Sequence, residues 1–186
     1  TGQNVSHMLA ASADQKKFYT ANIGSDSITA FEFQGVPPSA SKITHIPVGK
    51  QPEAIDLSPD GKEVWVGLNA EGAVDVVDTA TGKVVEKVNL GDRPYRVKFS
   101  PDGKQVAATL INAKQLYLLD AATRKEIKKI QLESVPLGIV FSKDGKTAFL
   151  TVVQGDFVLK VDLEKGEIVN KLEIGQGPDG IALYGM

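Results

Sequence analysis

The sequence predicts an all-β fold, because one short corner motif recurs along the chain at a nearly constant interval. Ser58-Pro59-Asp60-Gly61-Lys62 returns 42 residues later at 100–104, and a variant with lysine in place of proline follows after another 42 at 142–146. A fainter copy occupies 12–16, where Gln15 replaces the glycine. Pro, Asp and Gly in this order favour a tight turn between two extended segments. A period near 40 residues with several short strands per unit is typical of β-propeller blades.

Prolines outside the corners keep the same register. Each stands in a link between two units, at 42-residue intervals: Pro52, Pro94, Pro136 and Pro178. No window shows the 3.6-residue apolar pattern of helical repeats. We therefore expect four four-stranded antiparallel blades over 7–49, 53–91, 95–133 and 137–175, followed by an inner strand over 179–184 that begins a fifth blade.

The first blade carries an insertion. Its strands are expected at about 7–12, 17–22, 27–33 and 43–48, and the third of these alternates apolar and polar residues as a half-exposed strand does. Gly35 to Ser39 holds the four extra residues of this unit. Because Pro37-Pro38 cannot lie inside a hydrogen-bonded ladder, we expect a surface loop there.

The second blade is the most regular, with strands expected at 54–57, 64–68, 74–77 and 84–90. Between the last two lies a hairpin with Gly82 at its left-handed corner. Arg124 replaces that glycine in the third blade, and Gly166 restores it in the fourth. Inner strands are rich in apolar β-branched residues, whereas outer strands are more polar. We therefore expect inner strands to be buried on both faces and outer strands to contact water.

Composition excludes several classes of function. The 186 residues are 42% hydrophobic and 24% charged, which is ordinary for a globular protein. A formal net charge of −2 provides no basic excess for binding nucleic acid. No apolar run approaches the roughly 20 residues of a membrane-spanning helix. Cysteine is absent, which excludes disulfides, thiolate zinc sites and cysteine nucleophiles.

Several repeated stretches resemble one known family. They are Tyr19-Thr20-Ala21-Asn22, Val66-Gly67-Leu68-Asn69, the corners, and Val76 to Val85. Together they are similar to the YVTN-type β-propeller repeat, which is found largely in bacterial and archaeal secreted, periplasmic and surface-layer proteins. The resemblance implies a ring of about seven blades and an extracytoplasmic location. Related propellers serve as lactonase-like enzymes, as protein-binding modules and in nitrous oxide reductase, and the fold alone does not choose among these roles.

Candidate binding residues follow from the repeat register. The residue after each linking proline, or its equivalent, opens an inner strand and should point toward the mouth of the central channel: His7, Glu53, Tyr95, Leu137 and Asp179. Varied residues there, beside nearly identical corners, are typical of a site grafted on a scaffold, although sequence drift also produces them. We take His7, Glu53, Tyr95 and Asp179 as a tentative ligand-binding set.

Two arginines extend this set. Arg93 and Arg96 flank Tyr95 and could capture an anionic group, since the guanidinium is a planar fork that matches a carboxylate or phosphate. The favoured alternative is an ordinary ion pair with Asp92 or with a carboxylate of a neighbouring blade.

Metal and catalytic motifs have little support. His7, Glu53 and Asp179 could bind a divalent ion, but His45 falls in an outermost strand and leaves one histidine at the mouth, so we expect no metal and no cofactor. No GxSxG, HExxH or GxxxxGK[ST] motif is present. We therefore expect a non-enzymatic binding or scaffold propeller outside the cytoplasm that presents a ligand- or protein-binding face. The alternative is a lactonase-like or redox-linked enzyme with its site at the same mouth.

Four blades alone would leave two broad apolar faces uncovered, because each blade buries its faces against its neighbours. Exposed apolar patches of that size are rare in a soluble monomer. We expect the rest of the ring to come from about three blades upstream of this sequence or, failing that, from a second copy.

Overall fold

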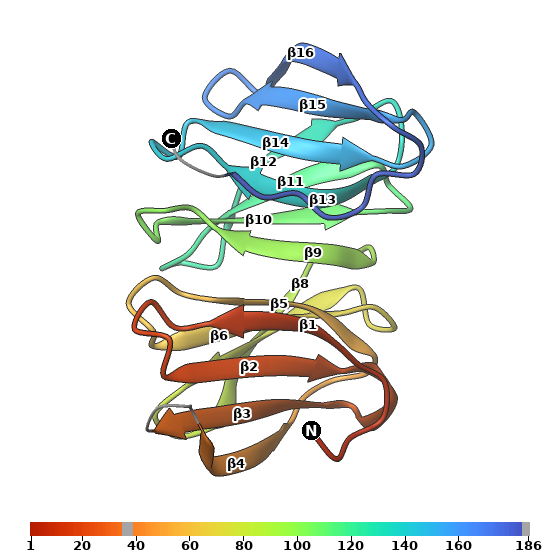
Figure 1. Ribbon diagram of the computed structural model, residues 1–186. Coiled ribbons are helices and arrows are strands. Elements are labelled where there is room, and N and C mark those ends of the chain that lie inside the picture. The colour runs from red at the N-terminus through yellow and green to blue at the C-terminus, as the bar shows by residue number, and fades with distance from the viewer. Residues whose placement is uncertain (35–38, 184–186) are drawn as a thin grey trace. The chain divides into compact units, whose positions relative to one another are not determined.

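The chain consists of antiparallel sheets, as the repeat pattern predicts. A computed structural model describes residues 1–34 and 39–183, and the chain divides into two units, Thr1–Pro94 and Tyr95–Met186. Over the described residues the strands form four sheets of four strands each, with one short 3-10 helix (Figure 1). The all-β prediction with four-stranded antiparallel blades is therefore confirmed.

The first unit holds two sheets in which strands adjacent in sequence pair with one another. The first sheet consists of β1 (Ser6–Ala11), β2 (Lys17–Asn22), β3 (Ser27–Gln34) and β4 (Ser39–Pro47), with the 3-10 helix η1 (Ile23–Ser25) between β2 and β3. The second consists of β5 (Pro52–Leu57), β6 (Glu63–Leu68), β7 (Ala73–Asp78) and β8 (Lys83–Asn89). The outer strand β4 begins four residues earlier than expected. Residues 35–38 of the predicted loop lie outside the described residues.

The second unit repeats this arrangement. One sheet consists of β9 (Pro94–Phe99), β10 (Gln105–Leu110), β11 (Gln115–Asp120) and β12 (Glu126–Gln131); the other consists of β13 (Pro136–Phe141), β14 (Thr147–Val152), β15 (Phe157–Asp162) and β16 (Glu167–Glu173). Residues 174–183 follow β16 without regular secondary structure. Residues 179–183 thus do not form the inner strand expected over 179–184, because no described strand pairs with them. Tyr184 lies outside the described residues.

The recurring corner is closed by its own side chains. Ser58 Oγ donates to Asp60 Oδ1 at 2.7 Å, and the same carboxylate oxygen accepts the backbone N–H of Lys62 at 3.1 Å. Equivalent bonds recur at 12–16, 100–104 and 142–146. The serine hydroxyl, and then the lysine N–H, lower the pKa of Asp60 and of its counterparts, because both donors stabilise the charged carboxylate.

Glycine at the corner serves a left-handed backbone. Gly61 has φ +73° and Gly103 has φ +71°. The first corner lacks glycine, yet Gln15 keeps the same region with φ +58°, and Arg124 does so with φ +63° at the glycine position of the β11–β12 hairpin. The turn geometry is therefore imposed by the ladder on both sides of the corner, even where the side chain makes it costly.

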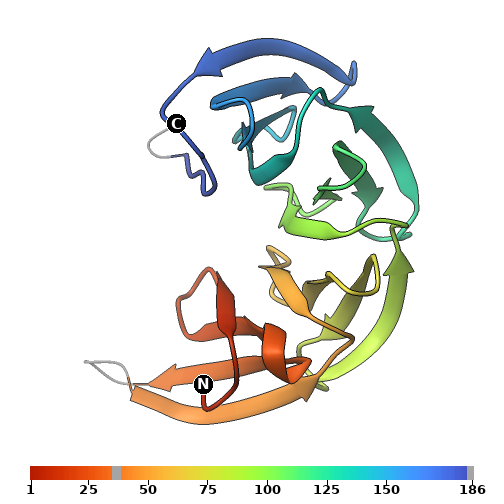
Figure 2. The same cartoon turned by 90° about the vertical axis from the view of Figure 1, so that its right-hand side faces the viewer.

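Within each unit, the two sheets pack face to face. In the first unit, β1 and β2 lie against β5 (Figure 2), and the shared core includes Tyr19, Ile28, Ile46, Ile55, Val66 and Leu68. In the second unit, β10 lies against β13, and the core includes Leu116, Ile130, Leu132, Ile139, Phe141 and Leu150. Inner β5 is buried along its whole length, whereas every residue of outer β16 is exposed.

No helix among the described residues has the length and apolar character needed to cross a membrane.

Gly61→Val should lower the free energy of unfolding by about 1–3 kcal/mol, because a β-branched residue is strained at positive φ. A Cβ at this position would meet no atom within 4 Å, so the loss would come from the backbone alone. Thermal unfolding of the variant measures the loss. Gly175→Val is the matched control, since that glycine also faces open space but lacks a positive φ. An equal melting temperature for both variants would contradict the corner assignment.

Candidate functional site

The start of β5 places a buried carboxylate among polar neighbours. Glu53 is 7% exposed. Its Oε2 accepts the side-chain amide of Asn69 and lies 3.4 Å from Arg93 Nη2, while its Oε1 lies 3.8 Å from His7 Nδ1. We call these four residues the Glu53 cluster. It joins the starts of β1 and β5, the end of β6 and the link before β9, all within the first unit.

The Glu53 cluster is partly open to solvent. The side chains of His7 and Arg93 are 44% and 42% exposed, whereas the carboxylate beneath them is nearly covered. Asn69 Oδ1 and Arg93 Nε are buried without a hydrogen-bond partner among the described residues. Buried polar atoms of this kind usually have partners. The Glu53 cluster thus combines a carboxylate with one donor, Arg93 Nε, and one acceptor, Asn69 Oδ1, that make no hydrogen bond among the described residues.

A second group of predicted residues meets in the second unit. Asp179 Oδ1 accepts Arg96 Nη2 at 3.0 Å, and its Oδ2 accepts the Tyr95 hydroxyl at 3.4 Å. The guanidinium of Arg96 lies over the Tyr95 ring, with Cζ 4.2 Å from the ring centroid. Its Nη1 also donates to the Tyr95 carbonyl oxygen at 2.9 Å. The guanidinium is therefore held by the Tyr95 ring and carbonyl oxygen, and its Nη2 is directed to the carboxylate.

The six predicted residues are thus divided into two groups. His7, Glu53 and Arg93 belong to the first unit, and Tyr95, Arg96 and Asp179 to the second. Each arginine forms an ion pair with a carboxylate distant in sequence, in line with the alternative that the sequence favoured: Glu53 lies 40 residues before Arg93, and Asp179 lies 83 residues after Arg96. The side chain of Leu137, at the equivalent position of β13, brings no polar atom.

Two participating residues were not in the predicted set. Asn69 ends the YVTN-like stretch of the second blade, and its side chain donates to Glu53. Thr151 donates to the carbonyl oxygen of Asp179 at 2.6 Å. Thr109 and Thr151 occupy the same position of the 42-residue repeat. This recurrence is the sequence signal that could have identified Thr151.

The described residues contain no group of three or more His, Cys, Asp or Glu side chains arranged to hold a metal ion. His45 lies on the outer strand β4, where its Nδ1 is 3.0 Å from Thr29 Oγ1.

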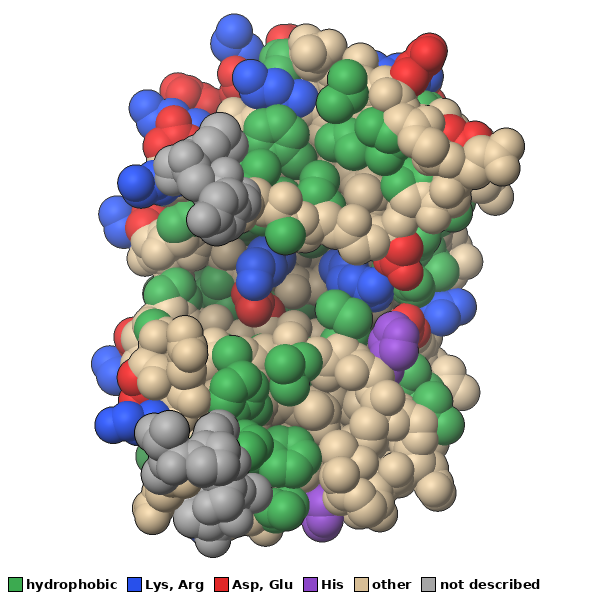
Figure 3. Space-filling model, viewed as in Figure 1, with side chains coloured by type: hydrophobic (Ala, Val, Ile, Leu, Met, Phe, Trp, Pro, Cys, Tyr) green, Lys and Arg blue, Asp and Glu red, His purple; other side chains and the backbone are tan. Residues whose placement is uncertain are grey.

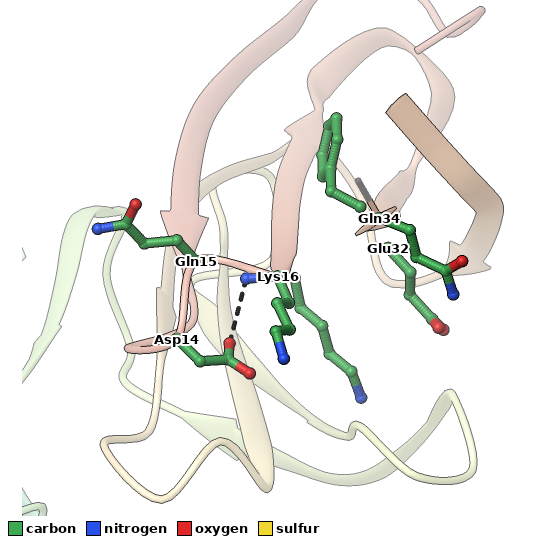
Figure 4. A pocket seen from close by; sticks show the side chains of 7 residues that line it. Asp14, Gln15, Lys16, Glu32 and Gln34 are labelled. Atoms are coloured by element: carbon green, nitrogen blue, oxygen red, sulfur yellow. Dashed lines mark hydrogen bonds between the residues drawn. The ribbon is translucent and has the colours of Figure 1, made fainter. Parts of the chain in front are cut away.

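One hollow involves neither group. About 500 Å³ in volume, it sits beside the first corner and the end of β3 (Figure 4). Its lining consists of Asp14, Gln15, Lys16, Lys17, Glu32, Phe33 and Gln34. A bond from the Lys16 N–H to Asp14 spans its rim at 3.1 Å. None of the predicted site residues contributes to it. We regard the inner-strand starts as the better candidate, because the hollow is mostly the outer side of a structural corner.

Comparison with known proteins agrees with this architecture. A family profile described as YNCE-like beta-propeller matches residues 10–147. No curated protein sequence gives a significant match.

Solved structures similar to the chain differ in function. Hydrazine synthase of Kuenenia stuttgartiensis has 24% identity and a TM-score of 0.81, with 94% of this chain and 50% of that chain covered. The beta-propeller domain of Cps50 (Swd1) from Myceliophteria thermophila has 15% identity and a TM-score of 0.76, with 95% and 58% covered. At these identities the likeness establishes the fold alone. The chain spans little more than half the length of either protein.

Glu53→Ala should lower the free energy of unfolding by about 1–3 kcal/mol, because it leaves the donors of Asn69 and Arg93 without their acceptor. Glu53→Gln keeps a carbonyl acceptor of the same size and should lose less. Urea denaturation of both variants measures the difference. Equal losses would contradict this prediction, because they would mean that the negative charge of Glu53, and neither its volume nor a neutral acceptor, accounts for its contribution to stability.

Proposed function

The chain belongs to the YNCE-like beta-propeller family, and we propose that it acts as a non-enzymatic binding or scaffold propeller. The binding face lies at the starts of the inner strands, which line the mouth of the channel in a complete propeller. The finer assignment to the YVTN type, and with it an extracytoplasmic location, belongs to this proposal and rests on the sequence resemblance.

One observation carries the proposal: Glu53, at the start of β5, and Asp179, at the equivalent repeat position within residues 174–183, are each held by an arginine and a second donor. Glu53 is held by Arg93 and Asn69, and Asp179 by Arg96 and Tyr95. A general acid or base must keep a lone pair or proton within reach of its substrate. Both oxygens of Asp179 and Oε2 of Glu53 are already occupied by donors, which favours fixed recognition over proton transfer.

The partly exposed groups of the Glu53 cluster suggest the kind of ligand. Arg93 presents a guanidinium that is 42% exposed, and its partner Glu53 offsets the charge only at one edge. His7 lies beside it at similar exposure. Both can donate to an anionic group on a ligand or on a partner protein. We therefore propose that the face recognises anionic groups.

An enzyme is the second candidate, because one structurally similar protein is hydrazine synthase. The two classes share the fold, so the choice must rest on the site itself. In an enzyme, Glu53 would be freed from Arg93 and Asn69 when substrate binds.

Titration with acetate and with inorganic phosphate, followed by NMR, tests the binding proposal. Arg93→Gln should weaken anion binding about tenfold, or about 1.4 kcal/mol. Lys83→Gln, which removes an exposed cation from outer strand β8, should leave binding unchanged. Equal effects of the two variants would contradict a site at Arg93. Turnover of simple lactones that is abolished by Glu53→Gln in a folded protein would favour the enzyme instead.

The β13–β16 sheet has one face available to a partner. Val158 and Leu172 pair across β15 and β16, as Ile28 pairs with Ile46 and Leu116 with Ile130 in other sheets. Ile46 and Ile130 are each 5% exposed because the next sheet of their unit covers them, whereas Leu172 is 62% exposed. Figure 3 shows hydrophobic side chains gathered over β14–β16. We propose that a further blade, supplied by a second copy of this chain, covers this face.

A second series of outer-strand residues is an internal control for this comparison. The equivalent positions on the opposite faces of the four outer strands are 45–58% exposed: Ile43 52%, Val85 58%, Ile127 45% and Val169 48%. The exposure of Val169 of β16 thus lies within the range of its counterparts on the other outer strands. The high exposure of Leu172 is therefore not a general property of β16 and reflects the uncovered face.

Leu172→Lys should therefore change the assembly of the chain, and Val169→Lys should not. Light scattering after gel filtration is expected to give the parent and Val169→Lys twice the mass of one chain, and Leu172→Lys the mass of one. A parent with the mass of one chain would exclude the second copy. Binding of an apolar dye that is lost in Leu172→Lys would then favour upstream residues, and dye binding equal in all three proteins would contradict the proposal.

A further inference from the structure

Residues 174–183, here called the strap, are attached to the second unit without being part of a sheet. Backbone N–H groups of Ile174 and Gly177 donate to the backbone oxygen and to the carboxylate of Asp156, each at 2.9 Å. The strap otherwise lies largely at the surface, and the side chain of Asp179 is 49% exposed. It is therefore a segment held at a few points rather than by a ladder.

The carboxylate of Asp179 is received by groups on a rigid strand. Arg96 and Tyr95 belong to β9, and the Arg96 side chain is 11% exposed. Arg96 donates to one carboxylate oxygen and Tyr95 to the other, so each oxygen has its own donor. This arrangement matches the two-oxygen geometry of a carboxylate. The receiving groups are ordered by β9, whereas the bound group comes from the strap.

The backbone of the strap is also received at a prepared position. Thr151 accepts the N–H of Gly138 at 2.7 Å and donates to the carbonyl oxygen of Asp179 at 2.6 Å. A Cβ at Gly138 would collide with that carbonyl oxygen, so only glycine permits the approach.

The same relay exists one repeat earlier with a different occupant. Thr109 accepts the N–H of Arg96 at 3.0 Å and donates to the carbonyl oxygen of Leu137 at 2.9 Å. Leu137 belongs to strand β13, which is held by its own ladder. At Thr151 the occupant is the strap, which has no ladder to hold it. The position thus accepts an extended peptide backbone, and its present occupant is the less firmly attached of the two.

We propose that Arg96, Tyr95, Thr151 and Gly138 form a docking site for an extended peptide bearing an aspartate, and that Asp179 is the chain's own occupant of it. The inference rests on the proposed binding function and names the ligand class at one of its two groups of residues. Arg96 and Tyr95 read the carboxylate, Thr151 holds the adjoining carbonyl, and Gly138 leaves room for the backbone. An incoming peptide replaces the strap contact for contact.

The strap sequence supplies the probe. A fluorescent peptide copying residues 176–183, blocked at both ends, is titrated against the full chain, and a second peptide carries Asn in place of Asp. Asp179→Asn removes the internal carboxylate and should bind the Asp peptide at least tenfold more tightly than the parent does. It should also prefer the Asp peptide to the Asn peptide at least tenfold. Glu173→Gln, which removes an exposed carboxylate from neighbouring β16, should behave as the parent.

Two further variants assign the preference to the receiving groups. In the Asp179→Asn background, Arg96→Gln should abolish the preference for Asp. Should Arg96→Gln fail to fold, Tyr95→Phe, which removes a single hydroxyl, should reduce the preference several-fold.

Several outcomes would overturn the proposal. They are undetectable binding of the Asp peptide to Asp179→Asn, equal affinity of parent and Asp179→Asn, and equal affinity for the Asp and Asn peptides. Free acetate that competes as strongly as unlabelled peptide would indicate a site for small carboxylates and would overturn the peptide assignment. Anion titration of Arg93→Gln tests the Glu53 cluster separately, so failure of one site does not imply failure of the other.

Discussion

The hydrogen-bonded corner between the first two strands of each sheet is the constraint on which the remaining structure depends. Asp60 Oδ1 accepts hydrogen bonds from the Ser58 hydroxyl and the Lys62 N–H, and Gly61, with its left-handed backbone, completes the turn. A strand that slipped by one residue would turn its apolar side chains to the wrong face. By fixing the register of the inner pair, the corner determines which residues enter the core between the two sheets of a unit.

Because the corners fix one end of each inner strand pair, the side chains at the other end can differ from sheet to sheet without loss of sheet stability. That end carries Glu53 in β5, Tyr95 in β9 and Leu137 in β13, three unlike residues at one position of the repeat. Glu53 and Asp179, which occupies the equivalent position of the last repeat, are each paired with an arginine, one from a link and one from a strand. A surface of fixed charges on a rigid scaffold is suited to recognising a partner of complementary charge.

Repeat arithmetic predicted most of the candidate residues but not their partners. The sequence favoured ion pairs for Arg93 and Arg96 but did not identify Glu53 and Asp179 as the two carboxylates. Nothing local indicates that the Asn69 side chain reaches Glu53 at the start of the neighbouring strand. Contacts of this kind depend on which loops the fold brings together, and a pattern within one repeat carries no such information.

The sequence by itself determined the strand order, the corners and the equivalent positions of each blade, because turn chemistry and alternation of apolar residues act over a few neighbouring residues. Only the tertiary structure decided the state of residues 174–183. Their sequence follows the inner-strand pattern, but a strand requires a partner to satisfy its backbone, and no described strand pairs with them. They are instead held by Thr151 and Arg96, two side chains that the fold brings to Asp179 from distant points of the chain.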